Sequence, residues 1–95
     1  MELEFSGPVF EWRGPAPFYF VTVPSESCAA IDDAKALVTY GWGMIPVTVT
    51  LGATTWTTSL WPKDEAYVVP LKVAVRRAER VEDGDVVDVR LEIAL

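Results

Sequence analysis

The feature that most constrains the fold is a set of short runs in which apolar and polar residues alternate. Near the C-terminus, such a run places Asp88, Arg90 and Glu92 between the apolar residues Val87, Val89, Leu91, Ile93 and Leu95. A period of two is typical of a β-strand with one buried face. Residues 45–51 follow the same pattern, and Gly52-Ala53 after them predicts a hairpin into a β-branched run at 54–60.

The stretch 54–78 holds the longest sequence of such signals, with a strand, a Pro-containing turn at 61–66 and a second alternating run at 67–77. We interpret the second run as one continuous strand. Its alternation assigns one set of residues to the core: Tyr67, Val69, Leu71, Val73 and Val75. Lys72 and Arg76 then share the opposite face of that strand.

The N-terminal residues 2–12 are interpreted as a strand with a break. Leu3 and Phe5 have one parity, whereas Phe10 and Trp12 have the other, and Gly7-Pro8 lies between the two pairs. A bulge or bend at Gly7-Pro8 would reset the register. Residues 18–23 are apolar at both parities, which predicts a strand that is covered on both sides.

One short helix is predicted over residues 26–38. Cys28, Ile31, Ala34 and Val38 recur at spacings of three and four, and Ser25 is a residue type that favours helix N-termini. Cys28 is expected on the inner face of this helix as a small core residue. The helix is expected to close one end of the structure.

These elements predict a mainly β fold with about six strands and one helix in a single domain spanning residues 1–95. The short connections favour mostly antiparallel pairing. A small closed or half-open β-barrel fits best, because closure removes exposed strand edges.

Composition limits the chemistry. The chain has no histidine, which removes the commonest general base and metal ligand, and its single cysteine excludes an intrachain disulfide. We therefore expect no metal and no cofactor. Eight basic and 14 acidic residues give a net charge of −6, which disfavours nucleic acid as a partner. An acidic N-terminus without a long apolar run predicts a cytoplasmic protein that does not insert in membranes.

Three blocks of sequence resemble a known family. They are Gly41-Trp42-Gly43 with Ile45-Pro46-Val47, the segment from Thr58-Ser59-Leu60-Trp61-Pro62-Lys63 to Val75-Arg76-Arg77-Ala78, and Gly84-Asp85-Val86-Val87. Together they are similar to the bacterial and archaeal domain of unknown function DUF1905. The resemblance implies a double-split β-barrel, the fold shared with AbrB/MazE-type transcription regulators and antitoxins. It implies no activity.

Two groups of residues are candidates for a binding site. Lys72 and Arg76 either hold a carboxylate or phosphate together or form a solvated face paired with acidic neighbours. Ser59, Trp61 and Lys63 lie where a strand meets a loop, and Trp61 either forms a ledge for a ligand or covers the barrel mouth. The same two alternatives apply to Trp42.

A catalytic role is not expected. Ser59 as a nucleophile would need a base, and without histidine only a lysine such as Lys72 with a strongly lowered pKa would serve. The acidic pairs Asp32-Asp33 and Asp83/Asp85 lack a metal-loop pattern and are interpreted as a solvated helix face and a tight turn.

The sequence thus predicts a non-catalytic module that binds a small anionic ligand or a protein partner, as a monomer or a homodimer. The alternative is a nucleic-acid-binding regulator like the AbrB/MazE-type proteins. Such a regulator would gather its basic residues on one surface.

Overall fold

A computed structural model describes residues 1–12, 18–38, 45–63 and 65–93, with the side chains of 34–38 also left undescribed. The elements in chain order are β1 (Glu2–Trp12), β2 (Phe18–Thr22), α1 (Ser25–Val38), β3 (Ile45–Leu51), β4 (Thr54–Lys63), β5 (Ala66–Leu71), α2 (Val73–Glu79) and β6 (Val86–Glu92). The predicted helix and hairpin are confirmed within a residue or two. Gly41-Trp42-Gly43 lies outside the described residues.

The six strands form a closed barrel in the order β1-β2-β5-β4-β3-β6. Every one of these pairings is antiparallel. The prediction of a mainly β, six-stranded antiparallel barrel is therefore confirmed. Because one chain closes the barrel, no second chain is needed to complete it.

Strand β1 contributes to both halves of the barrel. Residues 2–8 pair with β6, and residues 9–12 pair with β2. Gly7 lies at this junction, and a Cβ there would come within 3.2 Å of the Thr22 carbonyl oxygen. The absence of a side chain thus lets β1 pass close to β2 where it changes partner.

The predicted change of register at Gly7-Pro8 is wrong. Pairing continues without a skipped residue on both sides of this point, and Val9, at the same parity as Leu3 and Phe5, is buried in the core. Phe10 and Trp12 therefore keep the opposite parity and lie on the outer face of the barrel. The opposite parity of Phe10 and Trp12 in the sequence therefore indicates apolar residues on the outer surface.

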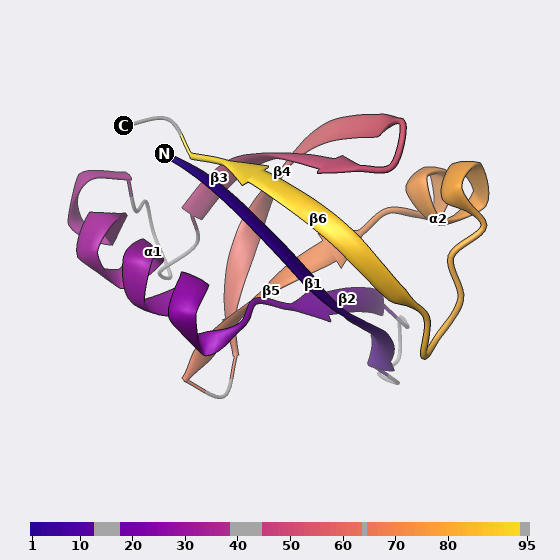
Figure 1. Ribbon diagram of the computed structural model, residues 1–95, viewed down its shortest axis with the longest axis horizontal. Coiled ribbons are helices and arrows are strands. Elements are labelled where there is room, and N and C mark those ends of the chain that lie inside the picture. Colours follow the sequence, from indigo (N-terminus) through magenta and orange to yellow (C-terminus); the bar gives the residue numbers. More distant parts are fainter. Residues whose placement is uncertain (13–17, 39–44, 64, 94–95) are drawn as a thin grey trace.

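The core fills the barrel from end to end. Its middle comes from inward positions of the strands, such as Val49, Leu60 and Leu91, each no more than 1% exposed. Cys28 and Ile31 of α1 belong to the same cluster, as do Val75 and Val81 around α2. The two helices lie at opposite ends of the barrel (Figure 1). The prediction that Cys28 is a core residue is confirmed.

Helix α2 is the largest departure from the prediction. Residues 67–77 do not form one strand, because β5 ends at Leu71 and the chain turns into α2 at Val73. The pairing of β5 with β2 ends at Leu71 opposite Tyr19. Ala, Arg and Glu in 74–79 are strong helix formers. Val73, predicted in the core, is consequently 51% exposed, whereas Val75 is 3% exposed.

Helix α2 is tied to the β3–β4 hairpin through Glu79. The Thr54 hydroxyl donates a hydrogen bond of 2.6 Å to Glu79 Oε2. Gly52 in the hairpin turn has a φ of +59°, and a Cβ there would collide with the Glu79 carboxylate. The glycine thus serves both the turn and the close approach of the helix.

Helix α1 is held to β5 by a buried tyrosine. The Tyr67 hydroxyl donates a hydrogen bond of 2.8 Å to Asp32 Oδ1, and Tyr67 is 6% exposed. Burial and the hydrogen bond to Asp32 raise the pKa of Tyr67 to about 12. Both the ring and the proton of Tyr67 therefore stabilise the folded state.

The helical assignment of 73–79 predicts different costs for two neighbouring truncations. Val75→Ala should lower the free energy of unfolding by about 2 kcal/mol, because a buried valine is lost from the core. Val73→Ala, at an exposed helical position, should change it by less than about 0.5 kcal/mol. Urea denaturation of both variants measures the difference. Equal, large losses would indicate a strand with both valines inside.

The Tyr67–Asp32 bond predicts a pH dependence in alkali. Because the folded pKa lies above the ordinary 10.0, the stabilisation is complete below pH 10 and is lost as the pH rises toward 12. Tyr67→Phe removes this titration, and its unfolding free energy should fall less steeply over that window. At neutral pH the variant should be about 1 kcal/mol less stable. Identical slopes for the two proteins would contradict the assignment.

Candidate binding surface

The barrel has two outer faces of opposite character. One consists of the outward residues of β6, β3 and the adjoining halves of β1 and β4, and we call it the polar face. Most of its outward residues are polar, namely Glu2, Glu4, Ser6, Thr48, Thr50, Thr55, Thr57, Ser59, Asp88, Arg90 and Glu92, but the outward positions also include Pro8, Pro46 and Val86, which is 72% exposed. The other consists of the outward residues of β2, β5 and the remaining halves of β1 and β4. It carries five aromatic rings, and we call it the aromatic face: Phe10, Trp12, Phe18, Phe20 and Trp61.

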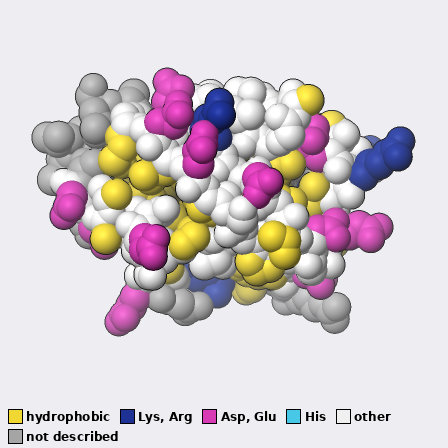
Figure 2. All heavy atoms as spheres, viewed as in Figure 1, with side chains coloured by type: hydrophobic (Ala, Val, Ile, Leu, Met, Phe, Trp, Pro, Cys, Tyr) yellow, Lys and Arg dark blue, Asp and Glu magenta, His cyan; other side chains and the backbone are white. Residues whose placement is uncertain are grey.

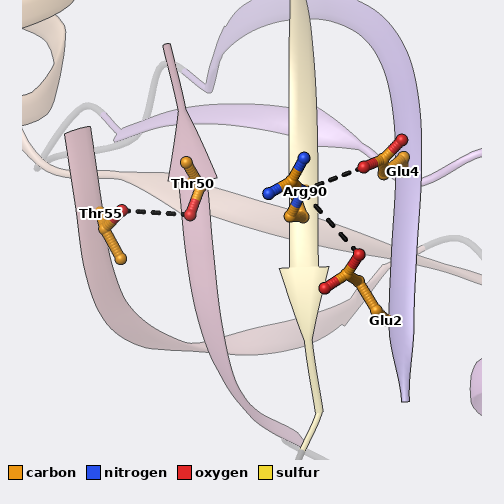
Figure 3. Close-up of polar contacts among 5 residues, drawn as sticks. All are labelled: Glu2, Glu4, Thr50, Thr55 and Arg90. Atoms are coloured by element: carbon orange, nitrogen blue, oxygen red, sulfur yellow. Dashed lines mark hydrogen bonds and ion pairs between the residues drawn. The ribbon is translucent and has the colours of Figure 1, made fainter. Parts of the chain in front are cut away.

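On the polar face, side chains pair with one another across the strands. Arg90 Nε lies 3.0 Å from Glu4 Oε1 and 4.0 Å from Glu2 Oε1. Thr50 and Thr55 share a hydroxyl hydrogen bond of 3.1 Å, as Figure 3 shows beside the Arg90 contacts.

The polar face also contains a hollow of about 540 Å³, lined in part by Glu4, Thr50 and Arg90. Ser6 and Asp88, which line it too, form a short hydrogen bond with each other. These partnerships satisfy the groups that would otherwise recognise a ligand, so the size of this hollow does not by itself indicate a site.

On the aromatic face, the rings contact one another in a continuous cluster. Trp12 stacks on Phe18 with centroids 6.2 Å apart. Trp61 meets Phe18 at 5.6 Å and Phe20 at 5.3 Å, and Phe20 meets Phe10 at 5.7 Å. These separations are in the range of favourable aromatic pairs.

The exposed fraction of the side chains differs across the aromatic cluster: its innermost residues are buried and its outermost rings are exposed. Phe20 and Val68 are each 2% exposed, although neither belongs to the barrel core. Trp12 and Phe18 are 46% and 40% exposed. The prediction that residues 18–23 are covered on both sides is confirmed at its centre, because Val21 faces the core and Phe20 lies beneath the aromatic rings.

An apolar hollow of about 230 Å³ lies in this face. It is lined by Trp12, Phe20, Trp61, Pro62, Lys63 and Val68. The Lys63 ammonium lies 5.9 Å from the centre of the Phe10 ring, within cation–π range. Among the outward positions of residues 9–12, 18–22, 59–63 and 66–71, Lys63 carries the one charge.

The predicted site residues separate into two groups. Ser59, Trp61 and Lys63 occupy alternate positions of β4 and therefore share its outer face, with Trp61 and Lys63 at the hollow. Lys72 is exposed directly before α2, and Arg76 lies one helical turn later. The predicted strand face joining Lys72 and Arg76 is wrong, and both residues belong to the α2 end of the barrel.

Arg76 packs on a ring at that end. Its guanidinium carbon lies 3.7 Å from the centre of the Tyr19 ring, and the Tyr19 hydroxyl donates a 2.7 Å hydrogen bond to Glu11. The hydrogen bond to the Glu11 carboxylate raises the pKa of Tyr19, while the nearby Arg76 charge acts in the opposite direction. Arg76 Nε is buried without a hydrogen-bond acceptor among the described residues. Arg76 therefore contributes by stacking, which holds α2 against β2.

Sequence reasoning missed Phe10, Trp12, Phe18 and Phe20 as members of a surface. Their signal was present in the parity of Phe10 and Trp12 and in the two-sided apolar run at 18–23. The parity of Phe10 and Trp12 was instead interpreted as a register change at Gly7-Pro8, and residues 18–23 were interpreted as a strand covered on both sides. Trp56, by contrast, is a core residue of β4 at 9% exposure.

Two further observations concern the described part of the chain. No three His, Cys, Asp or Glu side chains gather there in a way that suits a metal ion. Neither described helix has the length and apolar character required to cross a bilayer.

Comparison with known families assigns the chain. The sequence model of the domain of unknown function DUF1905 matches residues 5–91, and the chain therefore belongs to that family. A search of the curated proteins gives no match.

Proposed function

We propose that this DUF1905 domain is a non-catalytic binding module and that the aromatic face is its recognition surface. The observation that carries the proposal is the contrast between the two outer faces. The polar face is mostly charged and hydroxyl-bearing, with Val86 as an isolated exposed apolar side chain, whereas the aromatic face leaves the adjoining rings of Trp12 and Phe18 more than one third exposed above a buried apolar floor. Contiguous exposed apolar side chains often mark binding surfaces in soluble proteins, and aromatic rings are frequent among them.

The closed barrel restricts how a partner is recognised. Each of the six strands has two hydrogen-bonded neighbours in the closed barrel, so no whole strand lies at an edge of the sheet. This arrangement favours recognition through outward side chains. Aromatic rings suit this role because they offer a large apolar area with few rotatable bonds.

The size of the surface favours a small occupant. At 46% and 40% exposure, Trp12 and Phe18 together offer on the order of 200 Å². A stable protein–protein interface buries about 800 Å² on each partner. The described part of the aromatic face thus suits a small ligand or a short segment of a partner better than a second copy of the domain.

The available side chains support a non-catalytic role. The sequence contains no histidine, and the Cys28 thiol is buried and donates a hydrogen bond to the Val23 carbonyl oxygen. A serine nucleophile such as Ser59 would need an activating base.

A second candidate function is nucleic-acid binding at the α2 end. Four of the eight basic residues lie within nine positions there: Lys72, Arg76, Arg77 and Arg80. Figure 2 shows basic side chains at this end and acidic side chains spread over much of the visible face. The net charge of −6 and the neighbouring Glu82, Asp83 and Asp85 oppose this candidate, so the aromatic face is preferred.

The primary proposal predicts that a neutral aromatic probe binds at the hollow. Benzyl alcohol titrated into ¹⁵N-labelled protein should shift the indole N–H signals of Trp12 and Trp61, with a dissociation constant in the millimolar range, about −4 kcal/mol at 1 mM. The Trp56 signal should stay in place because that ring is in the core.

A matched pair of variants on β4 provides the control. Trp61→Ala should abolish the shift at Trp12, whereas Thr57→Ala, at the same parity on the polar face, should leave it intact. Unchanged Trp12 and Trp61 signals in the wild-type protein, or equal shifts across both faces, would contradict the proposal.

The second candidate predicts binding of duplex DNA at low salt. A gel-shift assay at about 20 mM salt should then show a complex that weakens in Arg77→Ala/Arg80→Ala and dissociates as salt rises. The double variant Lys63→Ala/Arg90→Ala, which removes the same charge away from α2, should retain the complex. Absence of a complex at low salt would eliminate this candidate.

A further inference from the structure

Helix α2 lies across one end of the barrel, between two anchored parts of the chain (Figure 1). Before the helix, Leu71 is still paired with β2. After the helix, Val9 of β1 donates a backbone hydrogen bond of 2.7 Å to the Asp85 carbonyl oxygen and accepts another of 2.7 Å from the Gly84 N–H. The strand pairings use no residue from 72 to 81, a range that the structure describes in full. This segment can therefore leave its place without any strand losing a partner.

The helix has little stability of its own. It has seven residues, whereas isolated helices shorter than about 12 residues are marginal in water. Lys72 at its N-cap makes no side-chain cap hydrogen bond, and the first turn has no acidic residue to interact with the helix dipole. Arg80 at its C-cap has a φ of +54°, a left-handed conformation that favours glycine. Contacts with the barrel must therefore hold α2 in place.

Apolar contact holds α2 through a small number of side chains. Val75 is the one buried residue of α2, and Val81 is buried just beyond the helix. At the C-terminal end of α2, the Glu79 carboxylate accepts the hydrogen bond from the Thr54 hydroxyl of β4. This bond is the polar attachment of α2 to the β3–β4 hairpin, and removing it should weaken the attachment of the helix to the barrel.

The third attachment of α2, the stacking of Arg76 on the Tyr19 ring, also destabilises the closed position. In this position Arg76 Nε is buried without an acceptor among the described residues. A buried donor without a hydrogen bond destabilises the state that buries it, whereas exposure to water restores the bond. The entropy of ordering the segment and the left-handed conformation of Arg80 act in the same direction. The closed position of α2 is thus weakly favoured compared with the barrel itself.

We propose that α2 is a displaceable cover on this end of the barrel, which opens as a unit while the six strands stay paired. The moving segment is 72–81, and the hydrogen bond from Thr54 to Glu79 holds it closed. In the open state, the apolar surface that Val75 covers faces solvent, so the end of the barrel becomes accessible without global unfolding. This conformational change does not depend on the aromatic face or on its proposed function.

Native-state amide hydrogen exchange of the full chain, followed by NMR, tests the proposal. The backbone amides of Arg76, Arg80 and Val81 donate hydrogen bonds within the segment 72–81, so they exchange when this segment opens. All three should give the same opening constant. It should be at least about 100-fold larger than that of amides in β6, a strand that pairs on both sides.

Three mild substitutions separate the opening of α2 from unfolding of the whole barrel. Ile45→Val, at a buried position of β3 paired with Leu60, should raise exchange of the strand amides about fivefold and leave that of the α2 amides unchanged, because the open state keeps this part of the core. Thr54→Val removes the hydrogen bond to Glu79 and should raise exchange of the α2 amides about fivefold. Thr57→Val, the same change at an outward position of β4, should leave α2 exchange unchanged.

The proposal is overturned if the α2 amides have the same opening constant as the strands and follow them in Ile45→Val, because α2 would then open only with the whole barrel. It is also overturned if Arg76, Arg80 and Val81 give unrelated opening constants, since the helix would then fray residue by residue. Exchange of the α2 amides that is equal in Thr54→Val and the wild type would overturn the role of the Glu79 hydrogen bond in holding α2 closed.

Discussion

Closure of the sheet is the constraint on which the rest of this structure depends. In a closed barrel, every strand has one face inside and one outside, so the alternation of the sequence decides what becomes core and what becomes surface. Inward positions such as Val49, Leu60 and Leu91 fill the interior, and the two helices cover its ends. Closure also gives every strand two neighbours along part of its length.

The two outer faces use these positions in different ways. On the polar face, charges and hydroxyls satisfy one another across neighbouring strands, as Arg90 does with Glu4. On the aromatic face, the rings of Trp12, Phe18 and Trp61 are held by contacts with other rings, and their outer parts face solvent. Because both faces belong to one small barrel, the outward side chains of the two faces can be compared directly.

Much of the fold was predictable from the sequence, because alternation is a direct consequence of strand geometry. The runs at 45–51 and 87–95 predicted β3 and β6, and short connections predicted antiparallel pairing. Helix α2 was not predicted because Val73 and Val75 continue the two-residue alternation of β5 past Leu71. A seven-residue helix is also too short to show a helical period of its own. Because Arg76 lies on this helix, it does not belong to the strand face on which it was predicted.

The candidate site was only partly predictable. Trp61 and Lys63 were identified from their place where a strand meets the predicted turn at 61–66. The structure extends β4 through Lys63, and both residues line the hollow. The parity of Phe10 and Trp12 was interpreted as a register change at Gly7-Pro8. In the structure, the register continues and both residues face outward. Phe10 and Trp12 are thus large apolar residues at outward positions of the barrel.

An NMR fragment screen with a library that is balanced in charge and polarity compares the two faces most directly. Our account predicts that the binding fragments concentrate at Trp12 and Trp61 on the aromatic face. The larger hollow near Glu4, Thr50 and Arg90 should attract few of them, because its polar groups are already paired. Fragments that gather on the polar face and leave the Trp61 signal in place would contradict the account.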